Sequence, residues 1–155
     1  MLDSPFPILH KHQVSQYMMM KSAVILMTLS LGACSFSSAS VTRDEMNIRA
    51  SQLTKLSAAM ESYVRYDNPA SGMNEDDLLK AATKDHPQLL SDFSNFKLRV
   101  LSRDRHATIL LCDKDGKRAL LEDAGCTGKM DLRHWEKKDA SCSFTLSTKE
   151  VCRSR

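Results

Sequence analysis

The sequence predicts an α+β domain: an N-terminal amphipathic helix and one or two short helices packed on a small antiparallel sheet of three or four strands. Three observations lead to this prediction. Apolar residues in 42–66 recur every three or four positions, as on the buried face of a helix, whereas those in 95–123 alternate or run together, as in strands. Four of the five cysteines lie in the second half of the chain, where two disulfides would stabilise a small core.

An export signal is predicted at the N-terminal end. Residues 18–34, MMMKSAVILMTLSLGAC, place one lysine before an apolar run that ends in small residues and a cysteine. This run is shorter than the roughly 20 residues of a membrane-spanning helix and suits the core of a signal peptide. Residues 1–17 hold two prolines and no basic cluster, so we interpret them as a non-native or mis-assigned leader. Translation would then start between Met18 and Met20.

The tetrapeptide Leu31-Gly32-Ala33-Cys34 resembles the lipobox of bacterial lipoproteins. The resemblance implies that residues 18–33 are removed and that Cys34 becomes the acylated first residue of the mature chain. Ser35 follows it, and in lipoproteins of enteric type a residue other than Asp at this position implies transfer to the outer membrane. Two alternatives remain open: a plain secretory peptide cut near Ser38, and a retained membrane anchor.

The mature chain would consist of a short tether and one domain. Residues 34–41 begin with the lipidated cysteine and are rich in serine, as in a flexible spacer, and 42–155 has the length of a single small periplasmic domain. Two of the 22 basic and one of the 19 acidic residues precede Cys34, which leaves a net charge near +2. This balance argues against a nucleic-acid partner.

Cysteine parity agrees with lipidation. Removing Cys34 from the count leaves Cys112, Cys126, Cys142 and Cys152, an even number that predicts two disulfides in an oxidising compartment. We favour Cys126–Cys142 with Cys112–Cys152, although Cys112–Cys126 with Cys142–Cys152 is nearly as well supported. No CxxC pair or suitably spaced histidine indicates zinc, and we expect neither a metal nor a cofactor.

The first helix is predicted over about Arg43–Tyr66. Thr42 and Glu45 form a T-x-x-E capping box, and Asp67-Asn68-Pro69 ends the element. Its apolar positions are spaced by three or four and should face the core; they are Met46, Ala50, Leu53, Leu56, Met60 and Tyr63/Val64. Two shorter helical segments follow, one capped by Asn74 over Glu75–Lys84 and one that begins at Pro87.

The sheet is predicted from a change to period two. Phe96, Leu98 and Val100 alternate with basic residues, and residues 107–112 (ATILLC) are almost wholly apolar. A tight turn at 113–116 (DKDG) leads to a third strand at 117–123 (KRALLED), for which a helix over 118–124 is the competing interpretation. We expect a long loop around 133–139 and a final strand at 143–146 (SFTL).

Catalytic and calcium sites are weakly supported. The DKDG turn could be aligned with an EF-hand loop, but the first ligand position would be Leu111 and the flanking segments are strands. A Cys–His nucleophile built from Cys112 with His106 or His134 would need a free thiol, which a disulfide removes. No GxSxG, HExxH or SxxK motif is present. We therefore expect a non-enzymatic protein.

Two features are candidate contacts with a protein partner. Basic residues gather on the first hairpin, and one tryptophan, Trp135, lies in a charged loop; the basic residues are Lys97, Arg99, Arg103 and Arg105. Basic residues on outward strand positions also commonly protect a sheet edge. The leading hypothesis is an outer-membrane lipoprotein that faces the periplasm and acts as an accessory factor of an envelope-spanning secretion, pilus or conjugation assembly. The alternative is an inhibitor or immunity protein that blocks a periplasmic enzyme or toxin.

Overall fold

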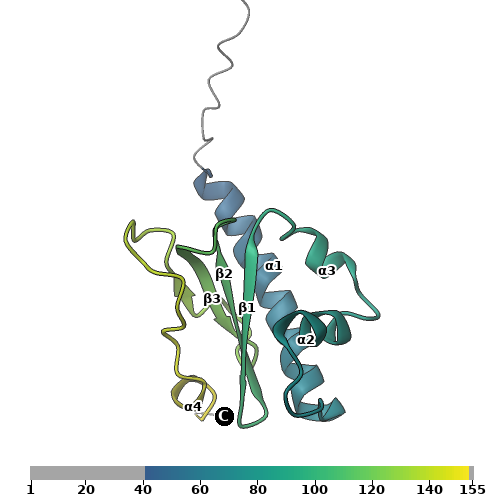
Figure 1. The fold of residues 1–155 in the computed structure, drawn as a ribbon. Helices are drawn as coiled ribbons and strands as arrows, with labels where there is room; N and C mark the ends of the chain where they lie inside the picture. Colours follow the sequence, from purple (N-terminus) through teal and green to yellow (C-terminus); the bar gives the residue numbers. More distant parts are fainter. Residues whose placement is uncertain (1–40, 154–155) are drawn as a thin grey trace, which may run out of the picture. The chain divides into compact units, whose positions relative to one another are not determined.

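The computed structural model describes residues 41–153, in which a long helix lies against a four-stranded antiparallel sheet (Figure 1). The predicted α+β fold is confirmed. The strands follow the chain in the order β1-β2-β3-β4, with β1 at Lys97–Arg103, β2 at His106–Cys112, β3 at Ala119–Ala124 and β4 at Leu132–Arg133. The expected leader, signal peptide, lipidated Cys34 and tether up to residue 40 lie outside the described residues.

Helix α1 spans Arg43–Ser62 and begins as predicted. The Thr42 hydroxyl accepts from the Glu45 amide, while the Glu45 carboxylate accepts from the Thr42 amide at 2.8 Å. The predicted stripe faces the core, because Leu53, Leu56 and Met60 are all 0 % exposed. One π-helical turn, Tyr63–Asp67, extends the helix to Asn68, whose positive φ of 54° ends it.

The two shorter helices lie beside the sheet and α1. Helix α2 spans Glu75–Ala82, and Asn74 caps it by accepting from the Asp77 amide at 2.9 Å. Helix α3 is a single turn, Gln88–Ser91. Leu78, Leu79 and Phe93 are buried by these segments against the same core as α1.

The two faces of β2 are both covered. Ala107, Ile109 and Leu111 join the core beneath α1, whereas Leu110 and Cys112 point to the opposite face and meet the segment around Ala140–Phe144. Figure 1 shows this C-terminal segment (yellow) running beside the sheet to α4, Thr148–Val151. All seven residues of β2 except His106 are buried, which explains why this strand is an apolar run.

Two tight turns connect the first three strands. Asp104 and Arg105 both have positive φ, 53° and 62°, as a two-residue hairpin turn between Arg103 and His106 requires. In the second turn, the Asp113 carboxylate accepts from the amides of Lys117 and Arg118 at 2.8 and 3.1 Å. The DKDG segment is therefore a hairpin connection, and the helical interpretation of 118–124 is wrong because β3 pairs with β2 there.

The final strand was predicted in the wrong place. Residues 143–146 are not a strand, and the fourth strand is the short β4, which pairs Leu121 with Arg133. The reason lies in β3, where the Glu122 carboxylate accepts from the amides of Thr145 and Leu146. The Glu122 side chain thus accepts the hydrogen bonds that a neighbouring strand would accept if residues 143–146 were paired in the sheet. The terminal tail also contains the unpredicted helix α4.

The four cysteines form two disulfides, but neither favoured pairing is correct. The bonds are Cys112–Cys142 and Cys126–Cys152. Residues 140–142 run beside the start of β3, where the Cys142 amide donates to the Lys117 carbonyl at 2.9 Å, and this position adjoins the end of β2. At the other end of the sheet, Cys126 follows β3 directly and Cys152 returns to it through α4. Strand pairing, rather than loop length, decides the connectivity.

Among residues 41–153, no helix has the length and apolar character required to cross a membrane.

Candidate functional site

Surface concavities of the described residues include one of about 700 Å³ along α1 beside residues 128–133 and a groove between α2, α3 and the start of β1. The groove has a volume of about 670 Å³. Apolar side chains, some of them half-buried in the main core, form its floor, and charged side chains stand around it; the apolar residues are Leu79, Leu90, Phe96 and Leu98, and the charged ones Glu75, Asp76, Asp77, Lys80 and Lys97. A groove of this composition suits a peptide with both apolar and charged side chains better than a polyanion.

One side of this groove is the start of the edge strand β1. Strand β1 is the outermost strand and pairs only with β2 among the described residues. Its other edge therefore carries backbone donors and acceptors that a further strand could use. Arg99 crosses from β1 to α2 and donates from Nε to both carboxylate oxygens of Glu75 at 3.1 Å, which fixes the helix against the strand.

The predicted basic cluster is not one surface. Arg99 forms an ion pair with Glu75, and Arg105 donates to the Arg65 carbonyl in the π-helical turn that follows α1. Lys97 lies on the groove and its side chain passes over Gly116, where an added Cβ would come within 2.8 Å of it. Arg103 is exposed near α4. Of the four residues, only Lys97 lines the groove.

Trp135 is half-buried rather than a protruding anchor. Its ring packs against the main core, and its Nε1 atom is buried with no hydrogen-bond partner among the described residues. The Arg43 guanidinium lies over the ring, 5.7 Å from its centre. Since the indole already packs on the protein, its outer face offers limited contact area.

Glu122 holds the C-terminal segment on the sheet. The carboxylate is 0 % exposed and faces away from α1. It accepts from the Thr145 hydroxyl at 2.8 Å and from the Thr145 and Leu146 amides at 3.0 Å, and His134 Nε2 lies 3.1 Å away. A buried carboxylate is stable only with such partners. Glu122 is therefore structural.

Glu61, near the end of α1, forms a second buried cluster. One carboxylate oxygen lies 2.7 Å from His106 Nδ1 and 3.3 Å from the Arg65 guanidinium, and the other accepts from the Ala107 amide at 2.8 Å. Both oxygens are used. The carboxylate thereby fixes the ring of His106 at the start of β2.

Asp123 is buried on the α1 side of the sheet. It accepts from the Ser57 hydroxyl and from the Asp131 amide, the latter at 3.3 Å. Burial, opposed by the Ser57 hydrogen bond and assisted by the charge of Asp131, raises the pKa of Asp123 to about 7. The side chain changes charge near neutral pH.

These three acids were missed as functional or structural sites by the sequence analysis. Glu122 and Asp123 are adjacent in a strand whose other residues are apolar, and successive side chains point to opposite faces. The sequence held one indication of this. If both faces of the strand are covered, two adjacent acids in it must both be buried, and each then needs hydrogen-bond partners. Glu61 had no comparable signal, because an acid near the end of an amphipathic helix is ordinarily exposed.

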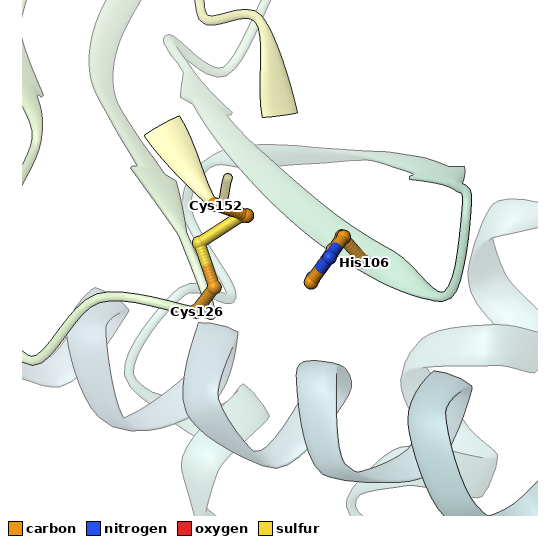
Figure 2. Close-up of side chains that lie close together, drawn as sticks. All are labelled: His106, Cys126 and Cys152. Atoms are coloured by element: carbon orange, nitrogen blue, oxygen red, sulfur yellow. A yellow bond between two sulfur atoms is a disulfide. The ribbon is translucent and has the colours of Figure 1, made fainter. Parts of the chain in front are cut away.

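His106, Cys126 and Cys152 place one nitrogen and two sulfur atoms within 4.8 Å of one another (Figure 2). Such atoms could ligate zinc as an imidazole and two thiolates. The two sulfurs are bonded to each other, however, so neither is a thiolate. With the disulfide intact, this cluster is a histidine beside a disulfide and not a metal site. Cys112 is bonded to Cys142 in the other disulfide, so it lacks the free thiol that a nucleophile needs.

No protein-family model matches the chain, and neither curated proteins nor solved structures gave a match.

Proposed function

We propose that this protein is an outer-membrane lipoprotein that faces the periplasm and binds an extended segment of another envelope protein, without catalysis, as an accessory factor of an envelope-spanning assembly. The groove beside β1 is the observation that carries the binding proposal. The lipobox-like sequence ending at Cys34 supports the anchor, and the two disulfides suit an oxidising compartment.

The expected ligand is a polypeptide in an extended conformation. Its backbone would hydrogen-bond to the free edge of β1, and alternate side chains would reach the apolar floor formed by Leu90, Phe96 and Leu98. Acids at the start of α2 and two lysines lie around that floor, so the bound segment should carry charges of both signs.

The buried acids support a binding role more than a catalytic one. Glu61 and Glu122 each have both oxygens occupied by partners within the fold, and Asp123 is bonded to Ser57 and Asp131. None of them lines the groove. Their roles are therefore to hold α1 and the C-terminal segment on the sheet.

Site-directed photo-crosslinking in cells tests the binding proposal. A photoreactive amino acid replaces Asp76 or Lys80, which are exposed at the groove, and the matched control replaces Asp139 in the exposed loop before Cys142. We expect one envelope protein to be crosslinked from both groove positions and not from Asp139. The crosslinked segment, made as a peptide, should shift the NMR signals of β1.

Crosslinking of equal strength from Asp139, or a peptide that leaves the β1 signals unchanged, would show that the groove is not the binding surface. The identity of the partner separates the two binding hypotheses. A secretion, pilus or conjugation component would support the accessory role, whereas an enzyme or toxin that is inhibited on binding would support the inhibitor role.

A further inference from the structure

The two disulfides lie in different surroundings. Cys112 is 0 % exposed and packs with Leu110 and Ala119 on the face of the sheet that the C-terminal segment covers, and its partner Cys142 is half-buried beside them. Cys126 and Cys152 are both half-buried. Cys152 also lines a small open pocket of about 160 Å³ together with His106, Lys149 and Arg153, among others. A reductant can therefore approach Cys152 without unfolding of the sheet.

A histidine stands beside this accessible bond. A ring nitrogen of His106 lies within 4.8 Å of both sulfur atoms, and Figure 2 shows the ring next to the disulfide at the start of β2. Glu61 holds the ring through its contact of 2.7 Å with Nδ1. The Arg65 ion pair and the Ala107 amide in turn hold Glu61. The position of the imidazole is thus determined by buried contacts that do not involve the disulfide.

We propose that Cys126–Cys152 is a reducible disulfide that exchanges with a dithiol through the pocket at Cys152, with His106 as the proton donor, while Cys112–Cys142 is a permanent structural bond. This proposal is independent of the groove beside β1. The neighbouring cations, Lys149 and Arg153, would favour the approach of a thiolate.

The exchange has two steps. A thiolate of the dithiol attacks Sγ of Cys152, the Cys126–Cys152 bond breaks, and its electron pair leaves on Sγ of Cys126, which takes a proton from His106. The second sulfur of the reagent, as a thiolate, then attacks the reagent sulfur that is bonded to Cys152; that bond breaks, and Cys152 leaves as a thiolate that takes a proton from solvent. The dithiol is oxidised to a disulfide, and the protein gains two thiols. His106 is reprotonated from solvent, which received the protons of the dithiol.

Reduction would release only the end of the chain. The Cys112–Cys142 bond and the hydrogen bonds from Glu122 to Thr145 and Leu146 remain, so the segment up to residue 146 stays on the sheet. Helix α4 follows that point; it packs against β2, buries Thr148 and is tied to the end of β3 by this disulfide. The bond thus controls whether α4 covers the end of the first hairpin.

A reduction time course on the purified full-length protein tests the proposal. Samples treated with dithiothreitol are quenched with an alkylating reagent, and labelled cysteines are located by peptide mass spectrometry. We expect Cys126 and Cys152 to be labelled together, at least about tenfold faster than Cys112 and Cys142, because access controls exchange. Equal rates for the two pairs, or faster labelling of Cys112, would overturn the proposal.

The role of His106 is tested with His106→Gln, and the exposed His86→Gln is the matched control. Removing a proton donor should slow reduction of Cys126–Cys152 by about tenfold. Simple loosening of the structure would instead accelerate it, so the direction of the change distinguishes the two effects. An unchanged or faster rate in His106→Gln would refute the proton-donor role, and the control should match the unmodified protein.

Discussion

The hydroxyl of Ser57 in α1 donates a hydrogen bond to the carboxylate of Asp123 in β3. Both residues are 0 % exposed, so the bond lies inside the interface between helix and sheet. The same hydroxyl is 3.1 Å from the Thr54 carbonyl. When Asp123 is ionised, the Ser57 hydroxyl donates to it. When Asp123 is protonated, the hydroxyl can donate to the Thr54 carbonyl and accept from the carboxyl group, so Asp123 has a hydrogen bond in both charge states.

Asp123 should make stability depend on pH near neutrality. Its pKa is 3.8 when unperturbed and about 7 in the folded protein. Between these values the folded state binds a proton that the unfolded state has lost. The contribution of Asp123 to the free energy of unfolding is therefore largest below about pH 4, falls as the pH rises to about 7 and is constant above that.

Asp123→Asn should remove this contribution. The difference in the free energy of unfolding, variant minus unmodified protein, should be about 1–3 kcal/mol more favourable to the variant at pH 8 than at pH 5. Urea unfolding at both pH values measures it, and the exposed Asp76→Asn is the control. Parallel pH profiles for Asp123→Asn and the unmodified protein would contradict the assignment.

Gly125 is required by close packing of α1 on the end of β3. A Cβ at this position would lie 2.1 Å from the Ser57 carbonyl oxygen and 2.5 Å from the Glu61 Cβ. Gly125→Ala should therefore lower the free energy of unfolding by about 3 kcal/mol, since the helix must move. Gly128→Ala, which meets nothing within 4 Å, should have a far smaller effect in the same denaturation experiment. Equal losses would show that the helix does not approach so closely.

Glu122→Gln should loosen the C-terminal segment. The neutral carbonyl of glutamine would be a weaker acceptor for the amides of Thr145 and Leu146, and its NH2 group would face the Thr145 hydroxyl and His134 in place of the charged oxygen. We expect a loss of about 2–4 kcal/mol and faster hydrogen exchange at both amides. The exposed Glu150→Gln serves as the control. Unchanged exchange at Thr145 would mean that the segment is held by other contacts.

Cys34→Ala should abolish lipidation. The expected result is a chain that no longer partitions with membranes after fractionation, because acyl chains supply most of the membrane affinity in this class of anchor. Cys112→Ala provides the comparison, as it removes a cysteine without affecting the anchor. Continued membrane association of Cys34→Ala would contradict the lipobox interpretation.

Local patterns predicted the elements well. The capping box at Thr42, the apolar stripe of α1 and the hairpin turn at 113–116 appear where expected. Each depends on residues only a few positions apart. The groove beside β1 was not predicted, because its floor combines residues of α2, α3 and β1, and these meet only when the helices pack at the edge of the sheet.

The disulfide pairing and the roles of the buried acids also depended on distant contacts. Cysteine number predicted two bonds, but which sulfurs meet is decided by the pairing of 140–142 with the start of β3 and by the return of α4 toward β2.

The sequence by itself determined the α+β class, the start of α1 and the number of disulfides, since these follow from periodicity, capping and composition; the export signal stays a prediction outside the described residues. Only the tertiary structure decided that Glu61, Glu122 and Asp123 are buried and that His106 lies beside Cys126–Cys152. The physical reason is that burial of charge and the meeting of side chains are properties of packed surfaces. Several of the residues that share such a surface are far apart in the chain, as Ser57 and Asp123 are at 66 positions.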